Sequence, residues 1–313
     1  MNKVCILGGS GFVGRHLTAR LSAAGIACRI PSRHPERQRH LLPLPGVELV
    51  PSNGLDPQTL AGLFQGCRAV INLVGILNEN RPGDFQRIHA ELPVAVLEAC
   101  KTSGVPRLLH TCALQASEQA PSRYLQTKAA GEQALFRLGP PEVAVTSFRP
   151  SVIFGPDDSF FNRFAGLLSS LPGPFPLACP RARFAPVYVG DVAEAFARSL
   201  DDPATRGQRY ELCGPRVFTL EELVRYTATL LGLRKRILCL PDFAARWQAA
   251  LLERVPGKPF SRDNYLSLQL ASLCGEDGLG RLGIAATDVD AVMPYALGGM
   301  DERGRYMRLR QLS

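Results

Sequence analysis

Three glycines spaced three residues apart lie close to the amino terminus: Gly8, Gly11 and Gly14. They follow a short apolar run, Lys3 to Leu7, and precede a segment whose apolar residues recur at helical spacing until Gly25. Glycines at such a turn let the backbone approach a pyrophosphate closely, and the free N–H groups and positive dipole end of the helix attract the anion. The first interval is one residue longer than in the usual G-x-G-x-x-G pattern. The turn predicts a dinucleotide-binding strand-turn-helix unit.

Strands and helices continue to alternate after this unit. Short apolar runs predict strands at residues 26–30, 47–50, 69–74, 108–113 and 143–148. Apolar residues at helical spacing predict helices at residues 56–64, 85–99 and 122–138. Pro93 predicts a local distortion of the second of these helices. The alternation predicts an α/β fold with a doubly wound parallel sheet of the Rossmann type.

The pattern changes after Pro156. Residues 185–200 are expected to form a strand and a helix that return to the sheet, and residues 209–213 one more strand. From Phe218 onward the chain is mostly helical, and Thr219 with Glu222 forms a capping-box pattern. We therefore expect two domains, which are an NADP-binding Rossmann domain at residues 1–156 and 186–215 and a smaller, mostly helical lobe for substrate or partner contacts at residues 157–185 and 216–313.

Several classes of protein are excluded by the sequence. No apolar stretch reaches the roughly 18 residues that cross a bilayer, and the first residues lack a secretory signal, so we expect a cytoplasmic location. The nine cysteines are scattered without a C-x-x-C, which predicts reduced thiols and neither a disulfide framework nor a zinc knuckle. The five histidines lie singly, and no metal site is expected.

The net charge of +8 admits a nucleic acid, an anionic membrane surface or a phosphorylated ligand as partner. The arginines are spread along the chain, and Arg234-Lys235-Arg236 is the one dense run. No nucleic-acid-reading motif is present, so we expect no nucleic-acid partner.

The end of the second strand indicates which dinucleotide is bound. An acidic residue there binds the ribose 2′-hydroxyl of NAD, but this chain has Ser32 and Arg33, which suit a 2′-phosphate. NADP(H) is therefore favoured over NAD(H). The alternative that Arg33 is one more solvated arginine stays open, because Arg29, Arg37 and Arg39 crowd the same segment.

Tyr124 and Lys128 lie four residues apart in a helical stretch after the fifth strand. This spacing puts both side chains on one face, where an ammonium can lower the pKa of a phenol and hold a ribose hydroxyl in a proton relay. The pair is where a tyrosine and a lysine would face a nicotinamide.

Together these residues resemble the extended short-chain dehydrogenase/reductase superfamily over nearly the whole chain. Further motifs, at residues 72–77, 110–114, 128–132 and 160–164, resemble the atypical subgroup named for the NAD(P)H-binding accessory subunit of respiratory complex I and its bacterial relatives. The resemblance implies that residues 149–156 face the nicotinamide and that residues 187–193 are the family's strand-to-helix return.

Candidate site residues follow from the motifs and the resemblance. The catalytic candidates are Tyr124, Lys128 and Cys112. The cofactor-binding candidates are Gly8, Ser10, Gly11, Phe12, Val13, Gly14, Ser32, Arg33, Asn53, Gly54, Leu73, Val74, Gly75, Thr111, Tyr124, Lys128, Pro150 and Ile153.

Two departures from the family pattern bear on activity. Cys112 stands where active members have a substrate-binding serine, and a thiol is a poor donor. His89 stands where an asparagine is expected, either to replace a relay water or, more in keeping with histidines generally, as a satisfied buried side chain. His110 lies on the same strand face as Cys112, but no acid or oxyanion device accompanies them, so thiol catalysis is not expected.

Three functions stay open from the sequence. The preferred one is an NADP(H)-binding protein with a largely non-catalytic accessory or assembly role, linked by resemblance to respiratory complex I or quinone metabolism. The second is an active NADP-dependent reductase or nucleotide-sugar epimerase or dehydratase that uses Tyr124 as acid/base, and the third is an NADPH-sensing binding module.

Residues 241–254 form an amphipathic helix with Phe243, Trp247 and Leu251 on one side. Amphipathic helices usually face a core, so packing inside the smaller lobe is the first expectation. The alternative is salt-sensitive peripheral association with the inner face of an anionic membrane or with a membrane-bound respiratory partner, because a basic run precedes the helix and further arginines follow in the tail, at Arg303, Arg305, Arg308 and Arg310.

Overall fold

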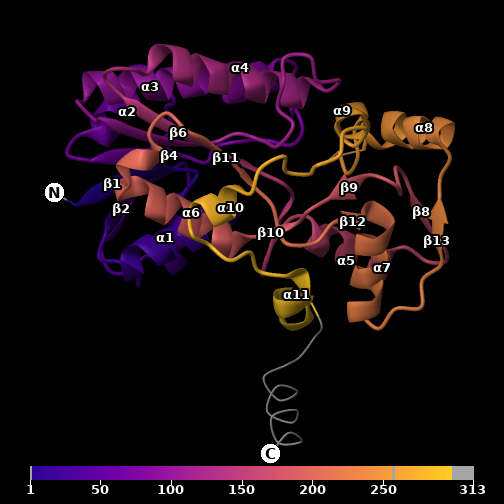
Figure 1. Ribbon diagram of the computed structural model, residues 1–313. Coiled ribbons are helices and arrows are strands. Elements are labelled where there is room, and N and C mark those ends of the chain that lie inside the picture. The colour runs from indigo at the N-terminus through magenta and orange to yellow at the C-terminus, as the bar shows by residue number, and fades with distance from the viewer. Residues whose placement is uncertain (1, 256–257, 298–313) are drawn as a thin grey trace, which may run out of the picture.

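The computed structural model describes residues 2–255 and 258–297, and the four tail arginines named above lie outside them. Seven strands form one parallel sheet in the order β3-β2-β1-β4-β5-β6-β11 (Figure 1). The strands are β1 Lys3–Leu7, β2 Ala27–Ser32, β3 Val47–Pro51, β4 Ala69–Asn72, β5 Arg107–Thr111, β6 Ala144–Pro150 and β11 Arg209–Leu212. The doubly wound parallel sheet expected from the alternation is confirmed.

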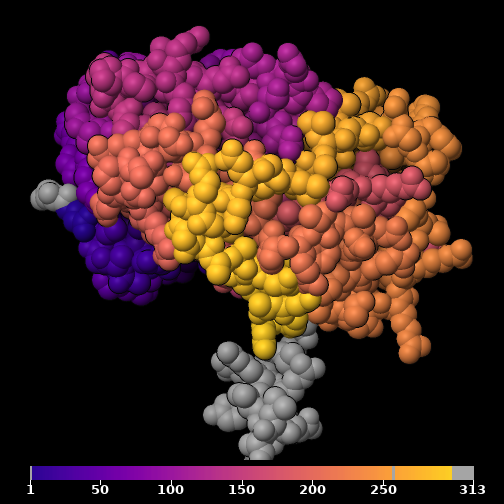
Figure 2. Space-filling model, viewed as in Figure 1, coloured from indigo at the N-terminus to yellow at the C-terminus, as the bar shows by residue number. Residues whose placement is uncertain are grey.

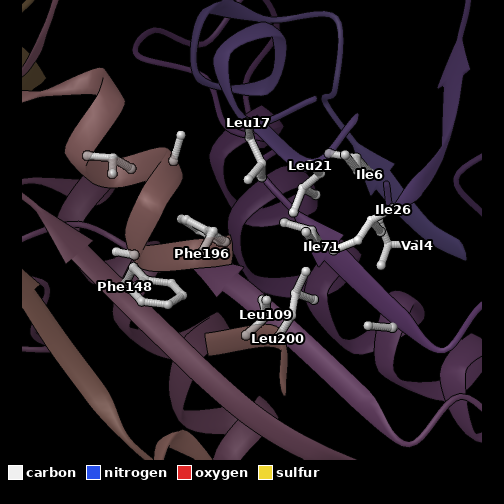
Figure 3. Close-up of a cluster of buried hydrophobic side chains, with 14 of the residues drawn as sticks. Val4, Ile6, Leu17, Leu21, Ile26, Ile71, Leu109, Phe148, Phe196 and Leu200 are labelled. Atoms are coloured by element: carbon white, nitrogen blue, oxygen red, sulfur yellow. The ribbon is translucent and has the colours of Figure 1, made fainter. Parts of the chain in front are cut away.

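Helices cover both faces of this sheet (Figure 1). One face carries α1 Phe12–Ala23 and α6 Val189–Asp201, and the other carries α2 Pro57–Phe64, α3 Leu92–Thr102 and α4 Arg123–Leu138. Figure 3 shows the first core, where Leu17 and Leu21 of α1 and Phe196 of α6 pack over sheet residues that include Ile71 and Phe148. The residues of β1 alternate between the two cores, with Val4 and Ile6 in one and Cys5 and Leu7 in the other, as a pleated strand requires.

The expected helix at residues 85–99 is divided. A π-helical turn, η2 Gln86–Glu91, precedes α3, and Pro93 lies in the first turn of α3. A proline has no N–H to donate and clashes with the preceding turn, which accounts for the irregular backbone just before it. The predicted distortion is confirmed.

Within residues 157–185, 216–255 and 258–297, the smaller lobe contains five helices of six or more residues and two short strand pairs. The helices are α5 Phe161–Ser170, α7 Leu220–Leu230, α8 Asp242–Leu252, α9 Arg262–Ser267 and α11 Val289–Leu297. The strand pairs are β12 Phe218–Thr219 with β9 Arg183–Phe184 and β13 Ile237–Cys239 with β8 Phe175–Leu177. The capping box of Thr219 and Glu222 is confirmed at the beginning of α7.

Three short helical segments complete the described elements. They are η1 Pro35–Leu41, η3 Pro203–Thr205 and α10 Gly278–Arg281. Leu279 and Ile284, in and after α10, pack in the core beneath α1 and α6. The chain therefore returns from the smaller lobe to the sheet before it reaches α11.

One expected strand does not join the main sheet. β10 Val187–Tyr188 pairs in parallel with β7 Ile153–Phe154 as a separate two-stranded sheet. The position next to β6 is occupied by β11, so the return at 187–188 finds its partner beyond the end of β6.

A disulfide between Cys213 and Cys274 corrects the expectation that every thiol is reduced. The other seven cysteines are free. Cys213 follows β11, and the chain returning from the smaller lobe brings Cys274 to a Cα–Cα distance of 6.0 Å. The two residues are 61 positions apart, so only the tertiary fold brings them within bonding reach.

The first expectation for α8 is wrong. Phe243, Trp247 and Leu251 are 69%, 76% and 64% exposed, while Ala245 and Ala249 are buried. The alanine side packs against Tyr265 of α9, because small side chains allow the two helices to approach closely. The apolar aromatic side faces outward at the far end of the smaller lobe, where α8 lies in Figures 1 and 2. No helix in residues 2–255 or 258–297 is long and apolar enough to cross a membrane.

Candidate functional site

The glycine turn has the geometry that a pyrophosphate requires. Gly8 has a φ of +78°, and Gly11 N–H donates to Gly8 O at 3.0 Å. A Cβ at Gly14 would lie 2.3 Å from Gly8 O, so only glycine lets α1 begin directly against the turn. The N-cap residue, Gly11, offers no side chain, and the first turn, which includes Phe12 and Val13, holds no acidic residue. The backbone N–H groups of this first turn have no partner within the helix, and with the neighbouring Ser10 they can hold a diphosphate.

The end of β2 presents a cation with no competing partner. Arg33 is exposed and forms no ion pair within the residues that the structure describes. Ser32 is buried, and its Oγ accepts the N–H of His34 at 3.2 Å, which fixes the turn that carries Arg33. Arg29 is engaged elsewhere, because its Nε lies 3.1 Å from Glu48 and its Nη1 donates to Leu63 O at 2.8 Å. Arg33 is therefore better placed than Arg29 to face a ligand.

Asn53 and Gly54 follow β3, next to this turn. Asn53 is exposed, and a Cβ at Gly54 would lie 2.7 Å from Asp56 Oδ2, the carboxylate that caps α2. The two residues thus lie at the same sheet edge as Ser32, where parallel strands present ligand sites.

The loop after β4 joins the two halves of the candidate site. A Cβ at Gly8 would lie 3.2 Å from the carbonyl carbon of Leu73, and a Cβ at Gly75 would lie 3.1 Å from Lys128 Nζ. Val74 N–H donates to Asn72 Oδ1 at 3.1 Å, which orders the loop. The glycine turn and Lys128 are therefore on opposite sides of residues 73–75.

Thr111 closes the site at the end of β5. Lys128 Nζ donates to Thr111 O at 3.1 Å, and Thr111 Oγ1 is buried with no hydrogen-bond partner. An unpartnered hydroxyl beside a buried ammonium fits the ribose or carboxamide of a nicotinamide. Pro150 ends the adjacent β6, and Ile153 lies in β7 just beyond it.

Burial sets the protonation of the catalytic candidates. It raises the pKa of Tyr124, with Cys112 and Asp263 adding to the effect, and it lowers the pKa of Lys128. Burial also raises the pKa of Cys112 to about 12, and its thiol donates to Lys128 O at 3.5 Å. The thiol is thus neutral and bonded to backbone, and it supplies neither a nucleophile nor a strong donor.

His89 is a satisfied buried side chain, as one of the two sequence interpretations holds. Its Nε2 accepts Ile76 N–H at 3.1 Å, so the neutral ring donates from Nδ1 to Thr127 Oγ1 at 3.2 Å. The ring lies between Phe85 and Tyr124, at centroid distances of 5.4 and 5.3 Å. Because both nitrogens are bonded, His89 does not hold a relay water.

His110 is buried on β5, and its Nδ1 lies 3.4 Å from Asn72 Nδ2. Its Nε2 has no partner. Cys112 is neutral, and the His110 ring faces the Asn72 amide through Nδ1.

Asp263 of α9 is a site residue that sequence reasoning missed. Its carboxylate accepts the N–H of Arg123 at 2.7 Å and of Tyr124 at 3.2 Å, so the smaller lobe caps the helix that carries Tyr124. A cavity of about 270 Å³ lies beside this contact, lined partly by Phe85 and Lys258. A lone aspartate in a distant helix carries no local signal. Among the described residues, no group of three His, Cys, Asp or Glu side chains could hold a metal.

Comparisons with known proteins agree with this fold. Residues 4–213 match the NAD dependent epimerase/dehydratase family. The chain is 31% identical, over 94% of its length and 75% of the relative's, to the mitochondrial NADH dehydrogenase [ubiquinone] 1 alpha subcomplex subunit 9 of Arabidopsis thaliana. It is 29% identical to the same subunit of Mus musculus, over 91% and 77% of the two chains. A dTDP-glucose 4,6-dehydratase mutant from Streptomyces venezuelae with NAD bound is similar in structure, with a TM-score of 0.73, 18% identity and coverage of 98% and 99%.

Proposed function

The chain belongs to the NAD dependent epimerase/dehydratase family, and on this premise we propose that it binds NADP(H) in a largely non-catalytic accessory role. The relatives named as NADH dehydrogenase subunits support a link to respiratory complex I or quinone metabolism. One observation supports the proposal that the role is largely non-catalytic. The parts that would hold a dinucleotide are assembled, whereas the expected substrate donor is Cys112, a neutral thiol bonded to Lys128 O.

In this proposal, different residues at the carboxyl edge of the sheet bind different parts of the dinucleotide. The first turn of α1 holds the diphosphate, Arg33 with Ser32 holds a 2′-phosphate, and Lys128 with Thr111 holds the nicotinamide half. When bound, the cofactor would supply a hydride acceptor or donor. Asp263 keeps the beginning of α4 in place by accepting two of its N–H groups.

Titration calorimetry with NADPH and NADH tests the cofactor proposal. One charge-assisted phosphate contact contributes about 1.5 to 3 kcal/mol, so NADPH should bind at least about tenfold more tightly. Arg33→Asp should abolish the preference, and Arg234→Asp, which changes an exposed arginine of the smaller lobe, should retain it. Equal affinities in the wild type, or a preference that survives Arg33→Asp, would contradict the proposal.

An active NADP-dependent reductase or nucleotide-sugar epimerase is the second candidate, because Tyr124 and Lys128 both lie at the site, against His89 and Gly75 respectively. In an active enzyme, Tyr124→Phe should lower turnover by about 10² to 10⁴ with cofactor affinity nearly unchanged, and Cys112→Ser should raise turnover. A rate indifferent to Tyr124 would remove this candidate. No turnover over a broad panel of carbonyl compounds and nucleotide sugars would favour the accessory role.

The outward face of α8, formed by Phe243, Trp247 and Leu251, supports peripheral association with the inner face of an anionic membrane or with a membrane-bound respiratory partner. These side chains are exposed together at helical spacing, which is unusual for a surface helix. Arg234, Arg236 and Arg254 are exposed nearby along the chain and form no ion pair within the described residues. Cations around an aromatic apolar face are typical of helices that lie on anionic lipid.

Liposome flotation tests this association. The wild-type chain should float with anionic vesicles at low salt and be released at high salt. Trp247→Ser should float much less, whereas Leu42→Ser, which removes an exposed leucine from the other domain, should behave as the wild type. A protein that stays in the soluble fraction at both salt concentrations would contradict a membrane surface.

A further inference from the structure

The amino-terminal edge of the sheet, opposite to the dinucleotide edge, holds a separate cavity. Arg107 and Ala144 are the first residues of β5 and β6, and both line it. Its volume is about 290 Å³. The charged residues of the lining are Arg68, Arg107, Glu142, Asp201 and Arg206. Because the strands are parallel, this cavity and the glycine turn lie at opposite ends of the same sheet.

The lining carries two cations without a carboxylate partner. Arg68 forms an ion pair with Asp201, and Glu142 lies 3.8 Å from Lys101, so these charges are balanced. Arg107 and Arg206 form no ion pair with any residue that the structure describes. The cavity therefore has a net positive lining.

Arg107 is the buried member of this pair, with 5% of its surface exposed. Its guanidinium donates to Ala144 O, Thr146 Oγ1, Ser199 O and Thr205 Oγ1 at 2.7 to 3.2 Å. All four acceptors are neutral, and Nε is buried with no partner. A buried cation held only by neutral groups is costly, and a nearby anion would reduce that cost.

The charges around Arg107 also leave its positive charge poorly compensated. Burial, and secondly the charge of Arg206, lower the pKa of Arg107 to about 10, while Tyr210 and Asp202 offset part of the effect. The two guanidinium groups therefore repel each other across this region. Arg68, another residue of the lining, likewise has a buried Nε without a hydrogen-bond partner.

We propose that this cavity, named here the amino-edge cavity, binds a phosphate or the phosphoryl end of a small metabolite between Arg107 and Arg206. Guanidinium groups present paired N–H donors that match the oxygens of a phosphate. The volume is at the lower end of the range for ligand pockets, so it suits a group of this size. An uncharged ligand would leave both cations uncompensated. This site is independent of the dinucleotide proposal.

Titration of the full chain with inorganic phosphate, at an ionic strength held constant with sodium chloride, tests the proposal. Binding should be saturable, and Arg206→Ala should weaken it about tenfold or more, because one charge-assisted contact is lost. Arg206 is exposed, so the variant should fold. Arg181→Ala, which changes an exposed arginine of the smaller lobe, serves as the matched control and should leave phosphate affinity unchanged. A parallel titration with glycerol 3-phosphate distinguishes the sources: binding of both ligands indicates a phosphomonoester, and binding of phosphate alone indicates the free ion.

A second readout locates the ligand. The buried Nε–H of Arg107 should give a protected NMR signal, absent in Arg107→Lys, and phosphate should shift it in the wild type but much less in Arg206→Ala. Phosphate affinity unchanged by Arg206→Ala, or lowered equally by Arg181→Ala, would overturn the site. An effect of phosphate no larger than that of sodium chloride would overturn it as well.

Discussion

His89 of η2 and His110 of β5 are both buried. Burial, with the charge of Lys128 as the second cause, lowers the pKa of each histidine to about 3. Both rings are therefore neutral in the folded protein, and in the unfolded chain they regain an ordinary pKa near 6.5. These two residues make the stability of the fold sensitive to mild acid.

Stability should fall as the pH drops below about 6.5. Between the folded and the ordinary pKa the unfolded chain binds more protons, so each histidine costs about 1.4 kcal/mol per pH unit in that window and nothing above it. From pH 7.5 to pH 5 the free energy of unfolding should decrease by about 2 kcal/mol for each histidine. Urea unfolding at the two pH values measures this. His89→Gln should remove about 2 kcal/mol of this decrease, and Leu42→Ser, which changes an exposed leucine and leaves every histidine in place, should leave the decrease unchanged. Identical slopes in all three proteins would contradict the assignment.

Local chemistry determines which site residues the sequence could reveal. Gly8, Gly14 and Lys128 belong to patterns whose spacing already fixes their geometry, and the structure brings them to one sheet edge. Asp263 could not be found this way, because it reaches Tyr124 from a helix more than a hundred residues away. The same holds for the unpartnered hydroxyl of Thr111, since a missing hydrogen bond is a property of the fold.

At the scale of elements, the contact between α4 and η2 is the closest one at the site. A Cβ at Gly131 of α4 would lie 1.9 Å from His89 O. The helix carrying Tyr124 and Lys128 thus packs backbone to backbone on the π-helical turn that carries His89. Glycine at this position therefore sets the distance between these side chains.

Gly131→Ala should destabilise the protein, although alanine is the better helix former. The propensity gain of about 1 kcal/mol is outweighed by overpacking, which costs about 1 to 3 kcal/mol and more where backbone cannot move. Gly62→Ala in α2 is the matched control: no atom lies within 4 Å of its Cβ, so it should stabilise by about 0.5 to 1 kcal/mol. Thermal and urea unfolding of both variants measure whether each substitution lowers or raises the free energy of unfolding. A Gly131→Ala protein as stable as the Gly62→Ala protein would show that α4 and η2 do not pack this closely.

Helices and strands that follow from a local apolar pattern could be predicted from the sequence. The sheet partner of a strand and the buried side of a helix could not, because they depend on which other elements pack there. The apolar runs of the main sheet and the helical spacing of α1 and α4 are local, so their bounds differ from expectation by only a few residues. β10 joins a separate sheet because β11 takes the place beside β6. The amphipathic pattern of α8 was real, but the pattern does not say which side is buried, and the alanine side faces α9.

At the scale of the whole molecule, the carboxy-terminal segment ties the two lobes together. After α9 the chain passes the end of β11, where Cys274 bonds to Cys213, and Gly275 N–H donates to Glu211 Oε2 at 2.6 Å. Leu279 then enters the core under α1 and α6. The disulfide closes a loop that contains α7, α8 and α9 of the smaller lobe.

Reduction of this disulfide should lower the stability of the whole protein. In the chain-entropy model, closing a loop of 61 residues raises the free energy of the unfolded state by about 4 kcal/mol. Measured stabilisations by disulfides are commonly about 2 to 4 kcal/mol. Cys213→Ser, or the wild type with reductant, should lose that amount in urea unfolding, and added reductant should not destabilise Cys213→Ser further. Cys239→Ser, which removes an exposed free thiol, is the control and should unfold as the wild type.

Thiol titration of the denatured protein should count seven free thiols before reduction and nine after it. Nine thiols without reductant would show that the pair is open in solution, and the smaller lobe would then be held to the sheet by non-covalent contacts, such as those of Asp263 and Leu279.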